Sequence, residues 1–343
     1  MSATGNAYPN MPERIEAGVT AAPAAVKPIP MRSSWGSRFA DKIFLGITIL
    51  CAISVLAIVV LIAYELITGS KLSLHAFGLK FFYSENWDPV AGEFGALPFV
   101  YGTLVSSLLA LILAVPVSLA AATFITVMCP GWLKGPLSFL MELLAAIPSV
   151  IYGLWAIFIL APLLRLHVQP FLGKYFGWTG LFSGPPFGIG MLAAGIILAI
   201  MIVPIVSSIS RDVMTAVPHS QREAVLALGA TRWEMIRVGI LRNARAGIVG
   251  GVILGLGRAL GETMAVTMVI GNRPEIAKSL FAPGYTMASV IANEFSEATD
   301  NLYLSAIIEI GLALFIVTLI VNAIAMALVW ATTRGMPARA HGQ

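Results

Sequence analysis

The chain has 343 residues, of which 58% are hydrophobic and only 11% are charged, and its formal net charge is +4. Soluble proteins carry about 25% charged residues, so this composition excludes a soluble globular protein, and the small net charge does not indicate nucleic-acid binding. Because backbone groups within a bilayer must be satisfied internally, we expect an all-α protein that crosses the membrane several times.

The chain divides into tails, a first anchor and a core. Residues 1–40 are polar and rich in Pro and Ala, which predicts a disordered cytoplasmic tail. Residues 41–66 are too long an apolar run for a signal peptide and predict a first transmembrane helix. We expect a periplasmic segment at 67–98, a core with five further transmembrane helices at 99–332, and a cytoplasmic tail at 333–343.

Each apolar run is near the ~20 residues that a bilayer requires. The six expected spans are Ile43–Leu66, Phe99–Met128, Leu137–Leu164, Gly188–Ile209, Gly247–Ile270 and Leu302–Thr332. With the N-terminus placed inside, 14 Lys and Arg residues fall in inner segments and 6 in outer segments. Positive charge favours the cytoplasmic side, which predicts that both termini and the loop 211–245 are cytoplasmic.

The loop 211–245 carries helix signals. Ser220 with Glu223, and Thr231 with Glu234, have the spacing of capping boxes. Gly229 lies between them, where a helix commonly ends. The loop is therefore predicted to form two short helices at the membrane surface, either lying in the interface or presenting a rigid knob to a soluble partner.

Two charges lie inside the fifth expected span, in the segment Gly257–Val266. A charge at bilayer depth costs roughly 2.5–3.5 kcal/mol on insertion scales, so such residues are kept where they line a polar path or pair with each other. Arg258 is expected roughly 16–18 Å from the inner end of the span, with Glu262 one turn further out on the same face.

The residue types fit an oxyanion path. The arginine fork can bind two oxygens of a phosphate group. Glu262 has two interpretations: it neutralises Arg258, or its carboxylate accepts a hydrogen bond from a protonated phosphate oxygen, which sulfate cannot offer. Glu142, about two turns into the third span and followed by Pro148, is either a weaker path or gate residue or a side chain that reaches back to the inner surface.

The fifth span is also rich in glycine. Gly247, Gly251 and Gly255, with Gly257 and Gly261, allow a neighbouring helix to approach closely. Because such packing is common in membranes, these glycines are interpreted as a helix interface rather than as ligands.

Several motifs carry a family resemblance. Glu223-Ala224-Val225 followed by Gly229 resembles the EAA loop of ABC-importer permeases, although Val225, Gly239 and Arg242 depart from that pattern. The other motifs are Trp87-Asp88-Pro89, Tyr101-Gly102-Thr103-Leu104, the stretch Glu142–Gly153 and the segment Gly257–Val266. Together they resemble the phosphate permeases of the type I, binding-protein-dependent ABC importers.

The resemblance implies a type I permease fold that translocates inorganic phosphate. It also implies that Glu223, Ala224 and Gly229 belong to a coupling element that contacts an ATPase. The implied partners are a second permease subunit, two ATP-binding subunits and a periplasmic phosphate-binding protein, besides phosphate and membrane lipid.

Other functions remain open at this point. The chain lacks the Gly-rich phosphate loop of ATPases, so we expect a transport subunit that is not an enzyme, without a cofactor or metal. A permease for another oxyanion, such as sulfate or molybdate, is one alternative. An ion-coupled secondary transporter could use Arg258 and Glu262 alone. An intramembrane enzyme would need a nucleophile and base or a metal set, and no such set is apparent.

Overall fold

The computed structural model describes residues 35–333, so most of the expected tails lies outside the described residues. The chain divides into two units at Val59 and Val60. The described part of the first unit belongs to helix α1 (Trp35–Gly69), which begins inside the stretch expected to be a tail. Within residues 35–333 there is no strand, and only two isolated β-bridges occur.

The second unit contains the rest of α1 and helices α2 to α14. Their bounds are α2 Lys71–Phe77, α3 Leu97–Thr123, α4 Gly131–Ala146, α5 Ser149–Trp155, α6 Ala161–Leu163, α7 Gln169–Phe176, α8 Met191–Thr215, α9 His219–Ala227, α10 Arg232–Glu234, α11 Arg242–Gly261, α12 Met264–Thr267, α13 Met287–Glu294 and α14 Asn301–Thr333. Short π-helical segments join α5 to α6, α6 to α7 and α10 to α11.

The described residues contain six helices that are long and apolar enough to cross a membrane, which confirms the expected number. They are Phe39–Gly69, Leu97–Met128, Ser149–Thr179, Met191–Thr215, Arg232–Gly261 and Asn301–Trp330. The bounds of the first, second, fourth and sixth spans differ from the expected bounds by only a few residues, but those of the third and the fifth differ by more.

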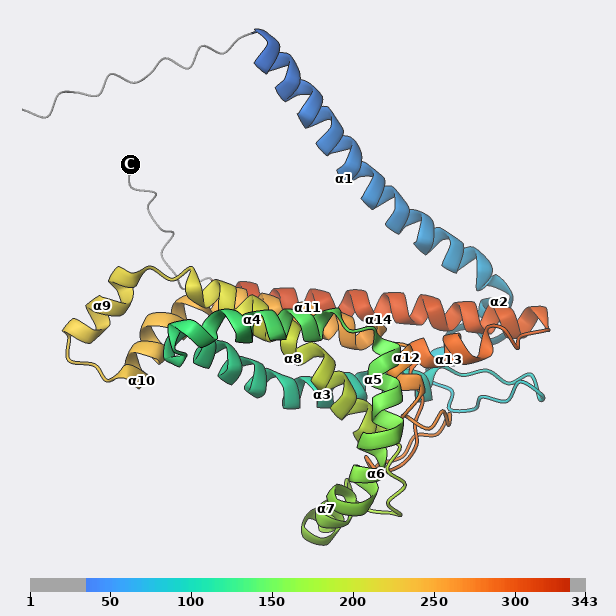
Figure 1. The fold of residues 1–343 in the computed structure, drawn as a ribbon. Coiled ribbons are helices and arrows are strands. Elements are labelled where there is room, and N and C mark those ends of the chain that lie inside the picture. The colour runs from blue at the N-terminus through green and yellow to red at the C-terminus, as the bar shows by residue number, and fades with distance from the viewer. Residues whose placement is uncertain (1–34, 334–343) are drawn as a thin grey trace, which may run out of the picture. The chain divides into compact units, whose positions relative to one another are not determined.

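The third expected span, Leu137–Leu164, is two separate helices. Helix α4 ends at Ala146 and α5 begins at Ser149, because Ile147 and Pro148 take extended ψ angles of 130° and 140°. A residue before proline is driven out of the helical region by the proline ring. The chain changes direction sharply at this point (Figure 1), and only the part after Pro148 has the length of a span.

The fifth span is displaced toward the N-terminus. It runs without a break from Arg232 to Gly261, so the second helix expected in the loop is the beginning of this span. Met235, Ile236 and Ile240 are buried in a cluster with Met214 and Val217, and this packing draws the helix start into the loop. At the other end, Glu262 is extended, with φ −72° and ψ 124°, and ends the helix.

Helices α3, α8 and α11 lie along one another and form the centre of the second unit (Figure 1). Three glycines on α11 face α8: a Cβ on Gly247, Gly251 or Gly255 would lie 2.5, 3.0 or 2.8 Å from a side-chain atom of α8. Their interpretation as a packing interface is confirmed. Gly257 and Gly261 have no atom within 4 Å of such a Cβ, so they do not contribute to this contact.

Candidate functional site

Arg258 lies on the last turn of α11, and its side chain is exposed. Among residues 35–333, no carboxylate lies within ion-pairing distance of its guanidinium. The guanidinium donors therefore stay available on the surface of this chain.

Glu262 does not share a helix face with Arg258, contrary to the sequence expectation. It is the first residue beyond α11 and is 9% exposed. Its Oε1 accepts a hydrogen bond of 3.4 Å from the backbone N–H of Ala265, in the short helix α12 that follows. Glu262 thus lies at a break between two helices, and the ion pair with Arg258 considered from the sequence is absent from the described residues.

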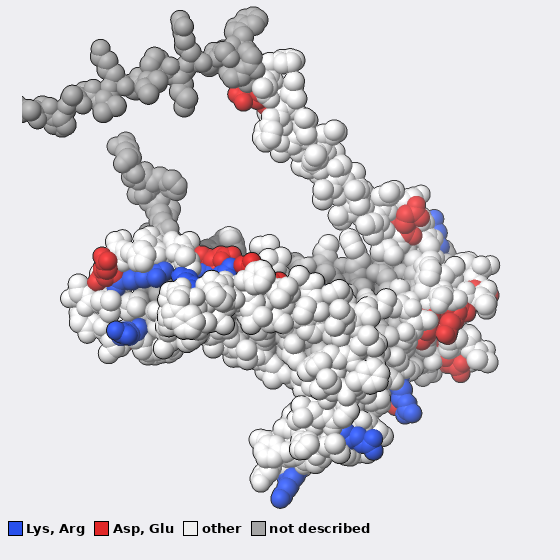
Figure 2. Space-filling view, in the orientation of Figure 1, with Lys and Arg blue, Asp and Glu red and all other residues white. Residues whose placement is uncertain are grey.

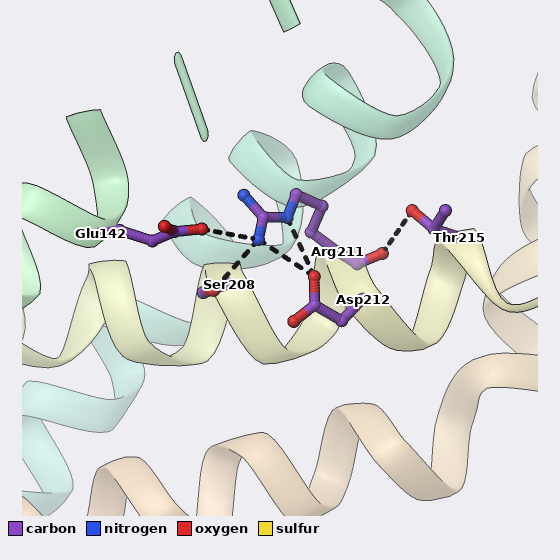
Figure 3. Close-up of polar contacts among 5 residues, drawn as sticks. All are labelled: Glu142, Ser208, Arg211, Asp212 and Thr215. Atoms are coloured by element: carbon purple, nitrogen blue, oxygen red, sulfur yellow. Dashed lines mark hydrogen bonds and ion pairs between the residues drawn. The ribbon is translucent and has the colours of Figure 1, made fainter. Parts of the chain in front are cut away.

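Glu142 also lies elsewhere than expected, on α4 and before the third span. Its Oε1 is 3.1 Å from Nη2 of Arg211 on α8, and Figure 3 shows this contact between the two helices. The same Nη2 is 3.0 Å from Oδ1 of Asp212 and 3.4 Å from the hydroxyl of Ser208. Since the Glu142 side chain is 59% exposed, the pair contributes only about 0–1 kcal/mol to stability.

The structure corrects the start of the loop expected at 211–245. Helix α9 begins at His219 directly after Pro218, with no side-chain cap, so Ser220 is already inside the helix and the first capping box is absent. The second box is confirmed: Thr231 and Glu234 cap each other's backbone N–H groups. Gly229 ends the first helix with φ +81°, a left-handed conformation that favours glycine.

The three residues expected to contact an ATPase, Glu223, Ala224 and Gly229, lie on an exposed surface. Glu223 and Ala224 are both exposed, and beside them Leu228 and Trp233 are 88% and 64% exposed. Nη2 of Arg222 donates a 2.8 Å hydrogen bond to the carbonyl of Met214, which fastens α9 to the end of α8. Helices α9 and α10 therefore form a protrusion, called the knob below, that is attached to the end of α8 and carries apolar side chains on its outside.

Charged side chains gather at the ends of the second unit. Figure 2 shows lysines, arginines and carboxylates near α9, α10 and α4, mainly carboxylates near α2 and α13, and lysines or arginines near α6 and α7, with a mostly uncharged surface between these groups. An apolar band between two charged rims is what a membrane-spanning bundle requires. Within residues 35–333, no group of three or more His, Cys, Asp or Glu side chains is placed to hold a metal ion.

The motif Tyr101–Leu104 holds the segment between α12 and α13. The hydroxyl of Tyr101 donates to the carbonyl of Ala277 at 3.0 Å, and the backbone N–H of Met287 donates to the Thr103 hydroxyl at 2.9 Å. Between them, Gly102 packs directly on the carbonyl of Tyr285. The sequence showed this motif only as part of a resemblance, because its partners lie more than 170 residues away.

Sequence reasoning missed a second contact at this end. Oε2 of Glu294 accepts hydrogen bonds from the Trp87 indole at 2.8 Å and from the Tyr303 hydroxyl at 2.7 Å. Trp87 also packs edge-on against Phe94. Burial raises the pKa of the neighbouring Tyr285 above its usual range. Trp87 therefore holds the segment that precedes α3 to α13, and through Glu294 to α14.

The chain matches the family described as binding-protein-dependent transport system inner membrane component over residues 114–335. A Mesorhizobium japonicum protein named phosphate transport system permease protein PstC is 48% identical over 294 residues, or 84% of this chain and 90% of that protein. The Pasteurella multocida protein of the same name is 46% identical, covering 84% of this chain and 91% of the relative.

A more distant relative comes from Methanocaldococcus jannaschii. It is named probable phosphate transport system permease protein PstC and is 38% identical, covering 78% of this chain and 88% of the relative.

Two solved structures share the fold. A chain from a bacterial ABC transporter that imports alginate aligns with a TM-score of 0.58 and 15% identity, covering 88% of this chain and 99% of the other. A chain of the methionine ABC transporter MetNI in an inward-facing conformation aligns with a TM-score of 0.50 and 18% identity, covering 69% and 95%. At these identities the likeness concerns the fold, which is that of type I ABC importer permeases.

Proposed function

The chain belongs to the family of binding-protein-dependent inner membrane transport components, and on this basis we propose that it is the phosphate permease subunit of an ATP-driven importer. It is a multi-pass protein of the inner membrane. The observation that carries the choice of phosphate is the 48% identity to a phosphate permease over 84% of the chain.

Arg258 is proposed to contact the anion. Its guanidinium is exposed on α11 and has no carboxylate partner within residues 35–333. Such a group suits an oxyanion, which it can bind through two parallel hydrogen bonds. Glu262 is proposed to sense the proton of phosphate, since the competing role as partner of Arg258 lacks the required ion pair. Glu142 is the weakest of the three proposed path residues, because Arg211 already occupies its carboxylate.

Energy is proposed to enter through the knob formed by α9 and α10. Glu223, Ala224 and Gly229 lie on it, together with the exposed apolar side chains of Leu228 and Trp233. An apolar, rigid protrusion suits insertion into a groove of a soluble subunit. ATP hydrolysis is then the work of two ATP-binding subunits, and the complex includes a second permease subunit and a periplasmic phosphate-binding protein.

The test is reconstitution of the complex that co-purifies with this chain. Mass spectrometry should identify an ATPase and a second permease, and proteoliposomes should take up phosphate only with ATP and the binding protein present. A tenfold excess of sulfate or molybdate should not reduce uptake. Uptake driven by an ion gradient without ATP would contradict the proposal in favour of a secondary transporter, and uptake of sulfate or molybdate in place of phosphate would assign another oxyanion.

A further inference from the structure

Helix α4 lies on the surface of the second unit. It begins after Pro130 and ends before Pro148, so that it has a break at each end. None of its residues is buried, although it lies against α8. A segment with few buried contacts opens more easily than the core around it.

Two polar contacts join α4 to the rest of the unit. At one, Glu142 is 3.1 Å from Arg211 on α8, as Figure 3 shows. At the other, the hydroxyl of Tyr152 on α5 donates a 2.8 Å hydrogen bond to the carbonyl of Leu144, across the break at Pro148.

The first contact leads to the cytoplasmic knob. Arg211 lies on the last turns of α8, where the Thr215 hydroxyl donates to its carbonyl at 2.8 Å. The neighbouring carbonyl of Met214 accepts the bond from Arg222 that fastens α9. A displacement of α9 therefore acts on the end of α8 that carries Arg211.

The second contact leads to the proposed anion path. Tyr152 lies on α5, one turn after Pro148. Its neighbour Gly153 packs against Ala265 and Met268, just beyond the helix break at Glu262. Here the break between α4 and α5 lies near the break between α11 and α12. The hydroxyl of Tyr152 thus holds α4 at the place where the two breaks meet.

We propose that α4 is a strap that links the knob to the anion path, with Arg211 and Tyr152 as positioning residues at its two ends. The inference rests on the proposed function. Arg211 is held ready on α8 by Asp212 and Ser208, whereas Glu142 is exposed. The pair of Glu142 and Arg211 is therefore weak enough to open and close in each transport cycle. Its closing fixes α4, and with it the break between α4 and α5 that Tyr152 spans.

The first test compares transport with ATP hydrolysis in the reconstituted complex. Glu142→Gln and Arg211→Gln should each lower the phosphate transported per ATP hydrolysed by about threefold or more, while the assembled complex and its ATP hydrolysis persist. Since both act through one contact, the double variant should be no worse than either single variant. Arg211→Lys, which keeps a charge within reach of Glu142, should restore most of the ratio.

A matched control separates this role from general stability. Tyr152→Phe should lower the ratio, whereas Tyr101→Phe, which loses a comparable bond from a tyrosine hydroxyl to a backbone carbonyl, should not. Equal ratios in wild type, Glu142→Gln and Tyr152→Phe would overturn the proposal, as would multiplying effects in the double variant.

A second readout does not depend on the substrate. In a complex carrying Cys51→Ala and Cys129→Ser, a single cysteine is placed on α4 by Ser138→Cys, one turn before Glu142 and half-buried, so that the pair of Glu142 and Arg211 stays intact. Its rate of labelling by a maleimide should differ by about threefold between the nucleotide-free and ATP-analogue-bound complexes. An unchanged rate would overturn the strap even where phosphate uptake is confirmed. A changed rate without phosphate uptake would contradict only the proposed substrate.

Discussion

Arg258 and Glu262 are four residues apart in the sequence, but they lie on opposite sides of a helix end. Arg258 is on the last turn of α11, whereas Glu262 is extended and accepts a hydrogen bond from the backbone N–H of Ala265 in the next helix. Their side chains can therefore contribute separately to a path, because neither is used to neutralise the other.

This separation predicts different results for the two residues. Arg258→Gln should reduce phosphate uptake by about tenfold or more, since a hydrogen bond to a charged group is worth about 1.5–3 kcal/mol, while the complex still assembles. Glu262→Gln should instead change discrimination, so that sulfate competes with phosphate while arsenate, which also carries a proton, continues to behave like phosphate. The measurement is uptake in a complex whose binding protein is bypassed. Full uptake by Arg258→Gln would remove the arginine from the path.

The turn at Gly229 predicts a defect in coupling. With φ at +81° and open space around the α-carbon, a substitution there acts through backbone strain alone, of about 1–3 kcal/mol for a residue such as valine. Gly229→Val should lower ATPase association and stimulated hydrolysis while the chain inserts normally. Gly229→Asn is the matched control, since asparagine tolerates this conformation. Equal activity in both variants would show that the turn is not part of the coupling contact.

The contact between Gly102 and the carbonyl of Tyr285 predicts a loss of stability. A methyl group at Gly102 meets backbone, which cannot move aside as a side chain can, so Gly102→Ala should destabilise by about 1–3 kcal/mol. Gly250→Ala, with no atom within 4 Å of the added carbon, should be tolerated. Thermal unfolding of the purified complex in detergent compares the two, and a Gly102→Ala variant as stable as wild type would contradict the contact.

The charge distribution predicts the orientation of the chain. In a cysteine-free background, Val90→Cys, at a position that is 98% exposed, should react in intact cells with a maleimide that does not cross the inner membrane. His219→Cys, at the start of the exposed helix α9, should react only after the cells are opened. Labelling of position 219 in intact cells with protection of position 90 would reverse the proposed topology.

Much of this protein follows from the sequence alone. The number of spans, the glycine face of α11, the left-handed turn at Gly229 and the capping box at Thr231 all depend on hydropathy or on residues a few positions apart. Local chemistry determines such features wherever the segment lies. The family resemblance was visible for the same reason, because its motifs are contiguous.

Only the tertiary structure decided which residues meet. The partner of Glu142 lies 69 residues away on α8, and Tyr285, which packs on Gly102, lies beyond three further spans. The start of the fifth span was decided by the burial of Met235, Ile236 and Ile240 against α8 and the segment that follows it. The helix end at Glu262 likewise separated a pair that helical spacing would have joined. Contacts of this kind depend on how distant helices pack, and no local pattern encodes them.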